Sequence, residues 1–189
     1  MDKLVIDIET KNAFADVGGQ QFLKNLDMSF LGVYSYNQDK YLSFFEEDFP
    51  KLSEFFSQAG LIIGFASNRF DIPILNKYLN RDLMAVPRID ILDEIEMASG
   101  RRVGLDLLAQ INLGMKKTAH GLKAIEFYRN GQFKELEEYC LQDVRVTKEL
   151  YDLARRQGYV LVPDRFSGEN ERVQLSFDEG EMVSKQSLF

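Results

Sequence analysis

An apolar, β-prone run near the N-terminus, Leu4–Thr10, carries two carboxylates at its end and constrains the fold more than any other segment. A run of this kind is typical of a buried strand. Asp7 and Glu9 lie two residues apart, so both side chains project from the same face of such a strand. Two unpaired carboxylates on a buried face repel each other and lose hydration, so a cation is the natural compensation. The alternative is that the strand ends at Ile6 and the two acids are solvated.

A third acid, Asp71, follows a second apolar run, Leu61–Phe65, and lies at the start of a predicted helix, Ile72–Leu79. Aspartate is favoured at helix N-caps, and Pro73 suits the first helical turn. Capping a helix and binding a metal do not exclude each other, so this position alone does not decide between the two roles.

A fourth acid, Asp143, lies on a long amphipathic segment that we expect to form a helix from about residue 136 to 156. Tyr139 precedes it by four residues and therefore shares its helix face. Asp143 interrupts an apolar stripe, which favours a functional role. The alternatives are that Asp143 pairs with Arg145 or Lys148 on the helix surface, and that Tyr139 is a packing aromatic.

Strands come first in the expected order of elements, with helices between and after them, which predicts an α/β fold with a mixed sheet. The periodicity fades after Pro163. We therefore expect one domain over residues 1–163, followed by a C-terminal tail or peripheral strand over residues 164–189. The other expected elements are a hairpin of residues 29–37 with 40–45, a helix over 48–59, and mostly helical structure from Asp90 onward.

Composition excludes several classes of protein. The chain has 189 residues, of which 45% are hydrophobic and 28% charged, as expected of one domain with a full core. It has no apolar run long enough for a membrane span and no signal peptide, so we expect a cytoplasmic protein. One cysteine and one histidine cannot build a Cys/His zinc site, so any metal must rest on oxygen ligands. The net charge of −7 disfavours non-specific binding along a nucleic-acid backbone, although residues 99–123 are locally basic.

Taken together, three segments resemble the three motifs of the DEDD superfamily of 3'-5' exonucleases. Asp7-x-Glu9-Thr10 is similar to the first motif, Phe70-Asp71 to the second, and Tyr139-x-x-x-Asp143 to the third. The tyrosine four residues before the last aspartate marks the tyrosine subclass, which includes proofreading domains of DNA polymerases. The resemblance covers roughly residues 4–160 and implies an RNase H-like mixed sheet flanked by helices.

The resemblance also implies a reaction, namely hydrolysis of phosphodiester bonds at single-stranded or unpaired 3' ends of DNA or RNA. Two divalent ions, Mg²⁺ or Mn²⁺, would assist it, and both prefer oxygen ligands. Asp7 would bridge both ions, Glu9 and Asp143 would complete the shell around the nucleophilic water, and Asp71 would serve the second ion. Tyr139 would orient the attacking water, since a phenol of pKa ~10 stays protonated at neutral pH.

Contacts to the nucleic acid are expected from residues around this centre. Thr10 would lie beside the terminal nucleotide, and Lys116, Lys117 and Arg69 could contact the backbone, the alternative being solvated surface charge. Phe14 and Phe22 could stack on a base, although core packing is the favoured interpretation for both.

One departure from the motifs concerns the second of them. Relatives commonly carry Asn two residues after its glycine, where this chain has Ala66, with Asn68 two places later. The departure bears on how the scissile strand is positioned and leaves the expected metal ligands unaffected.

Two other functions compete with the exonuclease hypothesis. An RNase H-like endonuclease would use the same metal centre, and a catalytically silent RNase H-like module would bind a partner protein. Gln186-Ser187-Leu188-Phe189 is somewhat similar to peptides that bind sliding clamps, so a protein partner at the tail is a further hypothesis. The alternative is that the last residues fold back onto the domain or are disordered.

Overall fold

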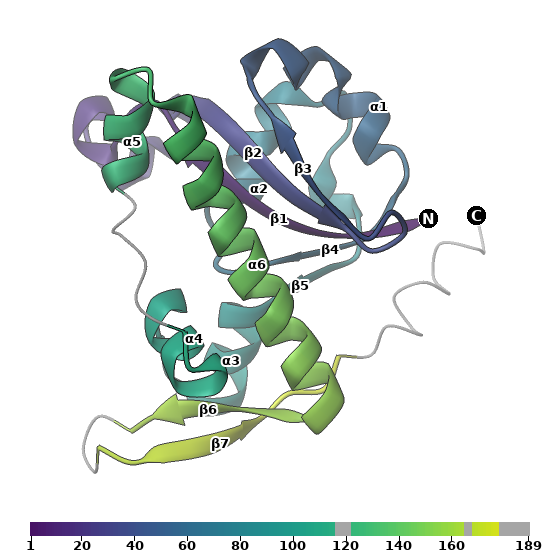
Figure 1. The fold of residues 1–189 in the computed structure, drawn as a ribbon, viewed down its shortest axis with the longest axis vertical. Coiled ribbons are helices and arrows are strands. Elements are labelled where there is room, and N and C mark those ends of the chain that lie inside the picture. The colour runs from purple at the N-terminus through teal and green to yellow at the C-terminus, as the bar shows by residue number, and fades with distance from the viewer. Residues whose placement is uncertain (116–121, 165–167, 178–189) are drawn as a thin grey trace.

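A five-stranded mixed sheet forms the centre of the computed structural model, which describes residues 1–115, 122–164 and 168–177 (Figure 1). The strand order is β3-β2-β1-β4-β5. β1 pairs antiparallel with β2 and parallel with β4, while β2–β3 is antiparallel and β4–β5 parallel. The predicted mixed sheet flanked by helices is confirmed. The strands of this sheet are β1 (Asp2–Thr10), β2 (Met28–Ser35), β3 (Lys40–Phe44), β4 (Ala59–Gly64) and β5 (Arg88–Asp90).

Helices cover both faces of the sheet. The 25-residue helix α6 crosses one face (Figure 1), together with α3 and α4, while α1 and α2 lie on the other. The α-helices are α1 (Leu52–Phe56), α2 (Asp71–Leu75), α3 (Ile91–Ser99), α4 (Leu105–Leu113), α5 (Leu122–Arg129) and α6 (Phe133–Gln157). The 3₁₀ helices are η1 (Phe14–Val17), η2 (Gln20–Asn25), η3 (Glu46–Lys51), η4 (Asn76–Tyr78) and η5 (Leu83–Ala85). Among the described residues, we find no helix with the length and hydropathy that a bilayer crossing requires.

Alternation along β1 assigns its side chains to the two layers. Leu4, Ile6 and Ile8 pack into the core beneath α1 and α2. Val5 packs on the opposite side, in the core beneath α6. Because successive strand side chains alternate, Asp7 and Glu9 share the face of Val5 and point towards α6. The strand continues to Thr10, so the interpretation that it ends at Ile6 is wrong.

Several predicted elements differ in detail from the observed ones. The hairpin is confirmed as β2 and β3. The helix expected over 48–59 is instead η3 followed by the short α1, because Pro50 lacks the N–H that a regular helix needs there, and Ala59 already begins β4. The helix expected over Ile72–Leu79 divides into α2 and η4.

Two features escaped the sequence patterns. β5 has only three residues and lies directly before α3, in a region where we expected helix from Asp90 onward. A second sheet of two strands begins after α6, whose C-cap is Gly158 with a φ of 79° that suits a glycine. Its first strand, β6 (Tyr159–Pro163), was not expected, whereas β7 (Asn170–Gln174) lies in the segment expected to be a tail or a peripheral strand. The division of the chain at residue 163 stays a prediction, and residues 178–189, with the clamp-like peptide, lie outside the described residues.

Candidate active site

Two of the four expected carboxylates lie on β1 and face α6. Glu9 is buried and Asp7 is partly exposed. They lie near the end of β1, where the strand pairs with β2 and approaches the beginning of α2. This arrangement leaves the pair at the edge of the core with one open side, as a site for a ligand requires.

Asp71 joins this pair through a backbone contact. Its Oδ1 accepts a hydrogen bond from the N–H of Ile8, the residue between Asp7 and Glu9, at 3.0 Å. Asp71 is the first residue of α2, and the N-cap is Phe70, so the capping interpretation is wrong. The side chain is held against β1 and is 4% exposed.

Asp143 and Tyr139 approach the same place from α6. The two cations that could have neutralised Asp143 have other partners, because Arg145 binds Glu149 and Lys148 binds Asp152, each at 2.9 Å. The interpretation of Asp143 as a surface ion-pairing residue is therefore wrong. Tyr139 is half-buried and packs against the small core of Phe30, Ala124, Leu136 and Cys140.

The four carboxylates share one electrostatic environment. Burial, followed by the charges of Asp71, Glu9 and Asp143, raises the pKa of Asp7 well above its ordinary value. Burial also raises the pKa of Glu9, with further contributions from Asp143 and Asp71. For Asp71 and Asp143, burial is again the main cause, and the pKa rises to about 7. The charge of Asp143 contributes to the raised pKa of each of the other three acids, so the four carboxylates lie close together.

A divalent cation fits this donor set. Among the described residues, no lysine or arginine forms an ion pair with any of the four carboxylates. Carboxylate oxygens are the ligands that hard divalent cations prefer. Ligand atoms of Asp7, Glu9 and Cys140 lie within 4.8 Å of one another, a spacing that could hold one ion.

Cys140 is a neighbour that the sequence patterns missed. Its Sγ lies 3.3 Å from Oδ2 of Asp7 and 3.4 Å from the carbonyl oxygen of Asp7, and the residue is fully buried. Gly32 on β2 permits this approach, because a Cβ there would lie 3.0 Å from both Cys140 Sγ and Val144 Cγ2. The available signal for Cys140 was its position directly after Tyr139, on the inner face of α6.

Asp106 is a second missed residue. It lies in the first turn of α4, and its charge raises the pKa of Asp143, second to burial. Burial and the nearby acids, Asp143 first and Asp106 among them, also raise the pKa of Tyr139, whose phenol therefore stays protonated at neutral pH. No pattern distinguished Asp106, because an aspartate early in a helix is common for reasons of helix stability alone.

Thr10 lines a pocket of about 220 Å³ together with Glu9. The Thr10 side chain is buried, and its Oγ1 donates a hydrogen bond to the carbonyl oxygen of Asn12 at 2.9 Å. Phe14 and Phe70 line the same pocket with their rings edge to face, 5.9 Å apart. The pocket offers a flat, mostly apolar space next to Glu9.

Arg69, Lys116 and Lys117 are the other residues expected to contact nucleic acid. Arg69 is half exposed, and its guanidinium binds Asp93 at 3.1 Å and Glu96 at 2.7 Å on α3. These acids compete with any phosphate for Arg69. Lys116 and Lys117 lie outside the described residues, so their role stays a prediction.

The loop after β4 contains Ala66, at the position where the second motif commonly carries asparagine. Ala66 has a φ of 60°, a left-handed conformation in which asparagine is more at ease than alanine. The side chain of Asn68 binds Asp93 and Arg88, each at 2.9 Å, and so is held on the side of α3. Asn68 therefore does not substitute for an asparagine at position 66.

Comparisons with known proteins bear on the fold and the family of the chain. A comparison with curated proteins finds no match. Among solved structures, the chain is similar to the family B DNA polymerase from the hyperthermophilic archaeon Pyrobaculum calidifontis, with a TM-score of 0.60 and 19% identity over 82% of this chain. The match spans 24% of that polymerase, and at this identity it shows the fold alone. The family model of the RNase_H superfamily matches residues 4–155, which include all four carboxylates and Tyr139, and the chain therefore belongs to the RNase_H superfamily.

Proposed function

We propose that this protein is a metal-dependent 3'-5' exonuclease that removes nucleotides from single-stranded or unpaired 3' ends of DNA or RNA. The observation that carries the proposal is the convergence of Asp7, Glu9, Asp71 and Asp143 at one end of β1. Four acids whose pKa values are raised by burial and by neighbouring carboxylates are an electrostatic liability unless a cation compensates them. Membership of the RNase_H superfamily supports a nuclease.

The donor set suits two ions, Mg²⁺ or Mn²⁺, which would neutralise the attacking and leaving oxygens and lower the pKa of a bound water. Asp7, nearest the centre of the acid cluster, would bridge them. Glu9 and Asp143 would hold the side of the nucleophilic water, and Asp71 would hold the side of the leaving group. Deprotonation of these acids on metal binding follows from their raised pKa values, since the cation favours their charged forms.

Tyr139 would position the attacking water. Its phenol keeps its proton at neutral pH because burial and the neighbouring acids raise its pKa, so it can donate a hydrogen bond and is a poor general base. The ring is fixed by packing against the core around Phe30, which reduces the entropy lost on ordering the water.

The pocket beside Glu9 would receive the terminal nucleotide. Phe14 and Phe70 present ring surface to a base, and such stacking accepts any base. Thr10 would lie against the sugar. Lys116, Lys117 and, in competition with its acidic partners, Arg69 would contact the phosphates.

A 5'-labelled oligonucleotide tests the proposal. An exonuclease gives a ladder that shortens progressively from the 3' end, and blocking that end with a 3'-phosphate slows it. An RNase H-like endonuclease gives discrete internal fragments and tolerates the block. A protein that releases no product with Mg²⁺ or Mn²⁺ would be a silent binding module, and the proposal would be withdrawn. Matched DNA and RNA oligomers in the same assay identify the substrate, which depends on the fit of a 2'-hydroxyl.

The remaining features of the proposal concern the chain as a whole. We place the catalytic domain at residues 1–163 and the protein in the cytoplasm, and we retain the C-terminal tail as a candidate contact for a protein partner. Deleting residues 186–189 tests the last point. A fall in thermal stability would indicate a packed tail, and unchanged stability without binding to a sliding clamp would remove the hypothesis.

A further inference from the structure

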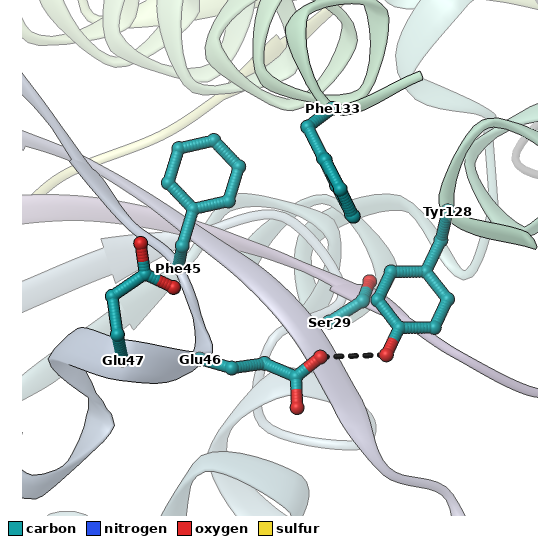
Figure 2. A pocket seen from close by; sticks show the side chains of 6 residues that line it. All are labelled: Ser29, Phe45, Glu46, Glu47, Tyr128 and Phe133. Atoms are coloured by element: carbon teal, nitrogen blue, oxygen red, sulfur yellow. Dashed lines mark hydrogen bonds between the residues drawn. The ribbon is translucent and has the colours of Figure 1, made fainter. Parts of the chain in front are cut away.

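A second pocket, of about 290 Å³, lies apart from the one beside Glu9, between the end of β3, α5 and the start of α6. Figure 2 shows side chains from these elements turned towards a common space. Its size is at the lower end of the range for small-molecule sites, so it suits a single side chain or ring. The lining residues are Ser29, Phe45, Glu46, Glu47, Tyr128 and Phe133.

Three aromatic rings wall this pocket. The Phe133 ring meets Phe45 at 6.3 Å and Tyr128 at 6.1 Å between centroids, both edge to face. Phe133 is 49% exposed although it begins a long amphipathic helix, so the ring is available to a ligand. Lys11 Nζ already lies 5.6 Å from the centroid of the Tyr128 ring, so the exposed Phe133 ring is the surface that this pocket offers to a flat or cationic group.

The floor of the pocket contains a buried hydroxyl that lacks a partner. Ser29 is the residue of β2 skipped where Glu9 pairs with Phe30 and Thr10 with Met28, so a bulge in the sheet redirects it. Within the described part of the chain, its Oγ finds no hydrogen-bond partner. A buried hydroxyl left unpaired is costly, so this oxygen is suited to a ligand that brings a donor.

The rim of the pocket is acidic. Glu46 accepts hydrogen bonds from the Tyr128 hydroxyl at 2.6 Å (Figure 2) and from Lys11, which engages its second oxygen. Glu47 is exposed and forms no ion pair with any described residue. Glu137, which accepts a hydrogen bond from Ser43, adds a further carboxylate beside β3.

These features together favour a cation over the base of a nucleic acid. A base could stack on the rings, but its phosphates would be repelled by Glu47, and Lys11 is already neutralised by Glu46. Carboxylates and ring faces both attract a guanidinium.

We propose that this aromatic pocket binds the arginine side chain of a partner protein. The guanidinium would pack against the exposed Phe133 ring, donate to Glu47, and reach the Ser29 hydroxyl with a further N–H. Arginine fits better than lysine because its planar group offers five donors and a stacking surface. Aromatic residues and arginine are also the pair most enriched at protein interfaces, which favours a protein over a free amine as the source.

Binding of an arginine peptide, followed by NMR on the ¹⁵N-labelled protein, tests this site. The probes are acetyl-Gly-Arg-Gly-amide and the same peptide with citrulline, which keeps the shape and removes the charge. We expect the arginine peptide to shift the amides of Ser29, Phe45, Tyr128 and Phe133, and the citrulline peptide to bind at least ~10-fold more weakly. Phe133→Ala and Glu47→Gln should each weaken binding by ~3- to 10-fold.

The control is Tyr41→Ala, which removes a similarly exposed aromatic ring, 41% exposed, elsewhere on β3 and should leave peptide binding unchanged. Equal binding of arginine and citrulline, or no shifts with ~10 mM peptide, the range of weak single contacts, would overturn the proposal. So would a short single-stranded oligonucleotide that shifts the same amides while the arginine peptide does not, because the pocket would then bind a base. The assay needs no nuclease activity, so its failure leaves the proposed function untouched.

Discussion

Buried acids occur in two neighbouring regions of this protein, and their surroundings differ. At the end of β1, Asp7 and Glu9 meet mainly other carboxylates. At the end of β5, Asp90 is 2% exposed and accepts hydrogen bonds from four backbone N–H groups, those of Ala66, Asn68, Leu92 and Asp93, at 2.8 to 3.3 Å. No described lysine or arginine pairs with the acids of the first region, whereas the fold itself supplies four donors to Asp90. Burial alone therefore does not distinguish a functional acid from a structural one, and the number of donors and of neighbouring carboxylates must be considered as well.

The largest effect, on hydrolysis, should come from removing an acid of the first region, at the end of β1. Asp7→Ala or Asp143→Ala removes an expected metal ligand, so we expect hydrolysis with Mg²⁺ to be abolished while the fold and the metal-free Tm are maintained or improved. Cleavage of a 5'-labelled oligonucleotide and thermal unfolding in EDTA measure the two halves. Glu149→Ala, on the same helix and paired only with Arg145, is the matched control and should remain active. Full activity in either aspartate variant would refute the assignment.

Removing the Tyr139 hydroxyl should have a smaller effect on hydrolysis at the same region. Tyr139→Phe removes the hydroxyl and keeps the ring that packs near Phe30, so we expect hydrolysis to slow by ~10 to ~10³-fold. Mn²⁺ affinity, measured by isothermal titration calorimetry, should not change. An unchanged rate would reduce Tyr139 to a packing residue.

Removing the acid of the second region, Asp90, should lower the free energy of unfolding. Asp90→Ala leaves several buried N–H groups without an acceptor, at ~1 to 3 kcal/mol each where no water replaces it, so we expect a loss of at least ~3 kcal/mol in the free energy of unfolding. Urea denaturation measures it. Asp82→Ala is the control, since Asp82 caps the short η5 at the surface and should cost only ~1 kcal/mol. Equal losses in the two variants would contradict the distinction drawn between Asp90 and a surface cap.

The pH dependence of stability tests the acids of the first region separately from Asp90. Burial and neighbouring acids raise the pKa of Asp71 and Asp143 to about 7 from an ordinary 3.8. The folded protein therefore holds protons that the unfolded chain has already released between about pH 4 and pH 7. Without metal, these groups make the free energy of unfolding fall as pH rises through that window.

Thermal unfolding in EDTA at pH 5 and pH 8 tests this expectation. The Asp143→Asn variant isolates one group, because the other acids of the protein titrate equally in both. We expect Asp143→Asn to be more stable than the parent at pH 8, by on the order of 4 °C in Tm, and to differ little at pH 5. Mg²⁺ should remove the difference at pH 8 by stabilising the parent. A difference that is the same at both pH values would show that Asp143 titrates normally.

Strong, local patterns made most of the fold and the carboxylates predictable. The apolar run around Asp7 identified β1, and the spacing of Tyr139 and Asp143 identified one face of α6. Pairs made across long separations could not be predicted. Asp71 meets the Ile8 N–H only because β1 and α2 lie together in the fold, and a pattern at Asp71 alone equally suited a cap. The three-residue β5 carries too few positions for its alternation to be visible.

Substitutions of Cys140 should have the smallest effects, and they test most specifically how the Asp7 carboxylate is held in place. The thiol lies 3.3 Å from Asp7 Oδ2, in a gap that Gly32 keeps open, so it both supports the carboxylate and fills the space beneath it. Cys140→Ser keeps a donor and should retain activity within ~3-fold, whereas Cys140→Val removes the donor, adds bulk against Gly32, and should slow hydrolysis by ~10-fold with a higher Mg²⁺ requirement. Thr147→Val, another buried polar-to-apolar change on α6, controls for lost stability and should leave the Mg²⁺ dependence unchanged. If the serine and valine variants have the same Mg²⁺ dependence as the parent, Cys140 only packs, and Asp7 is held by the strand alone.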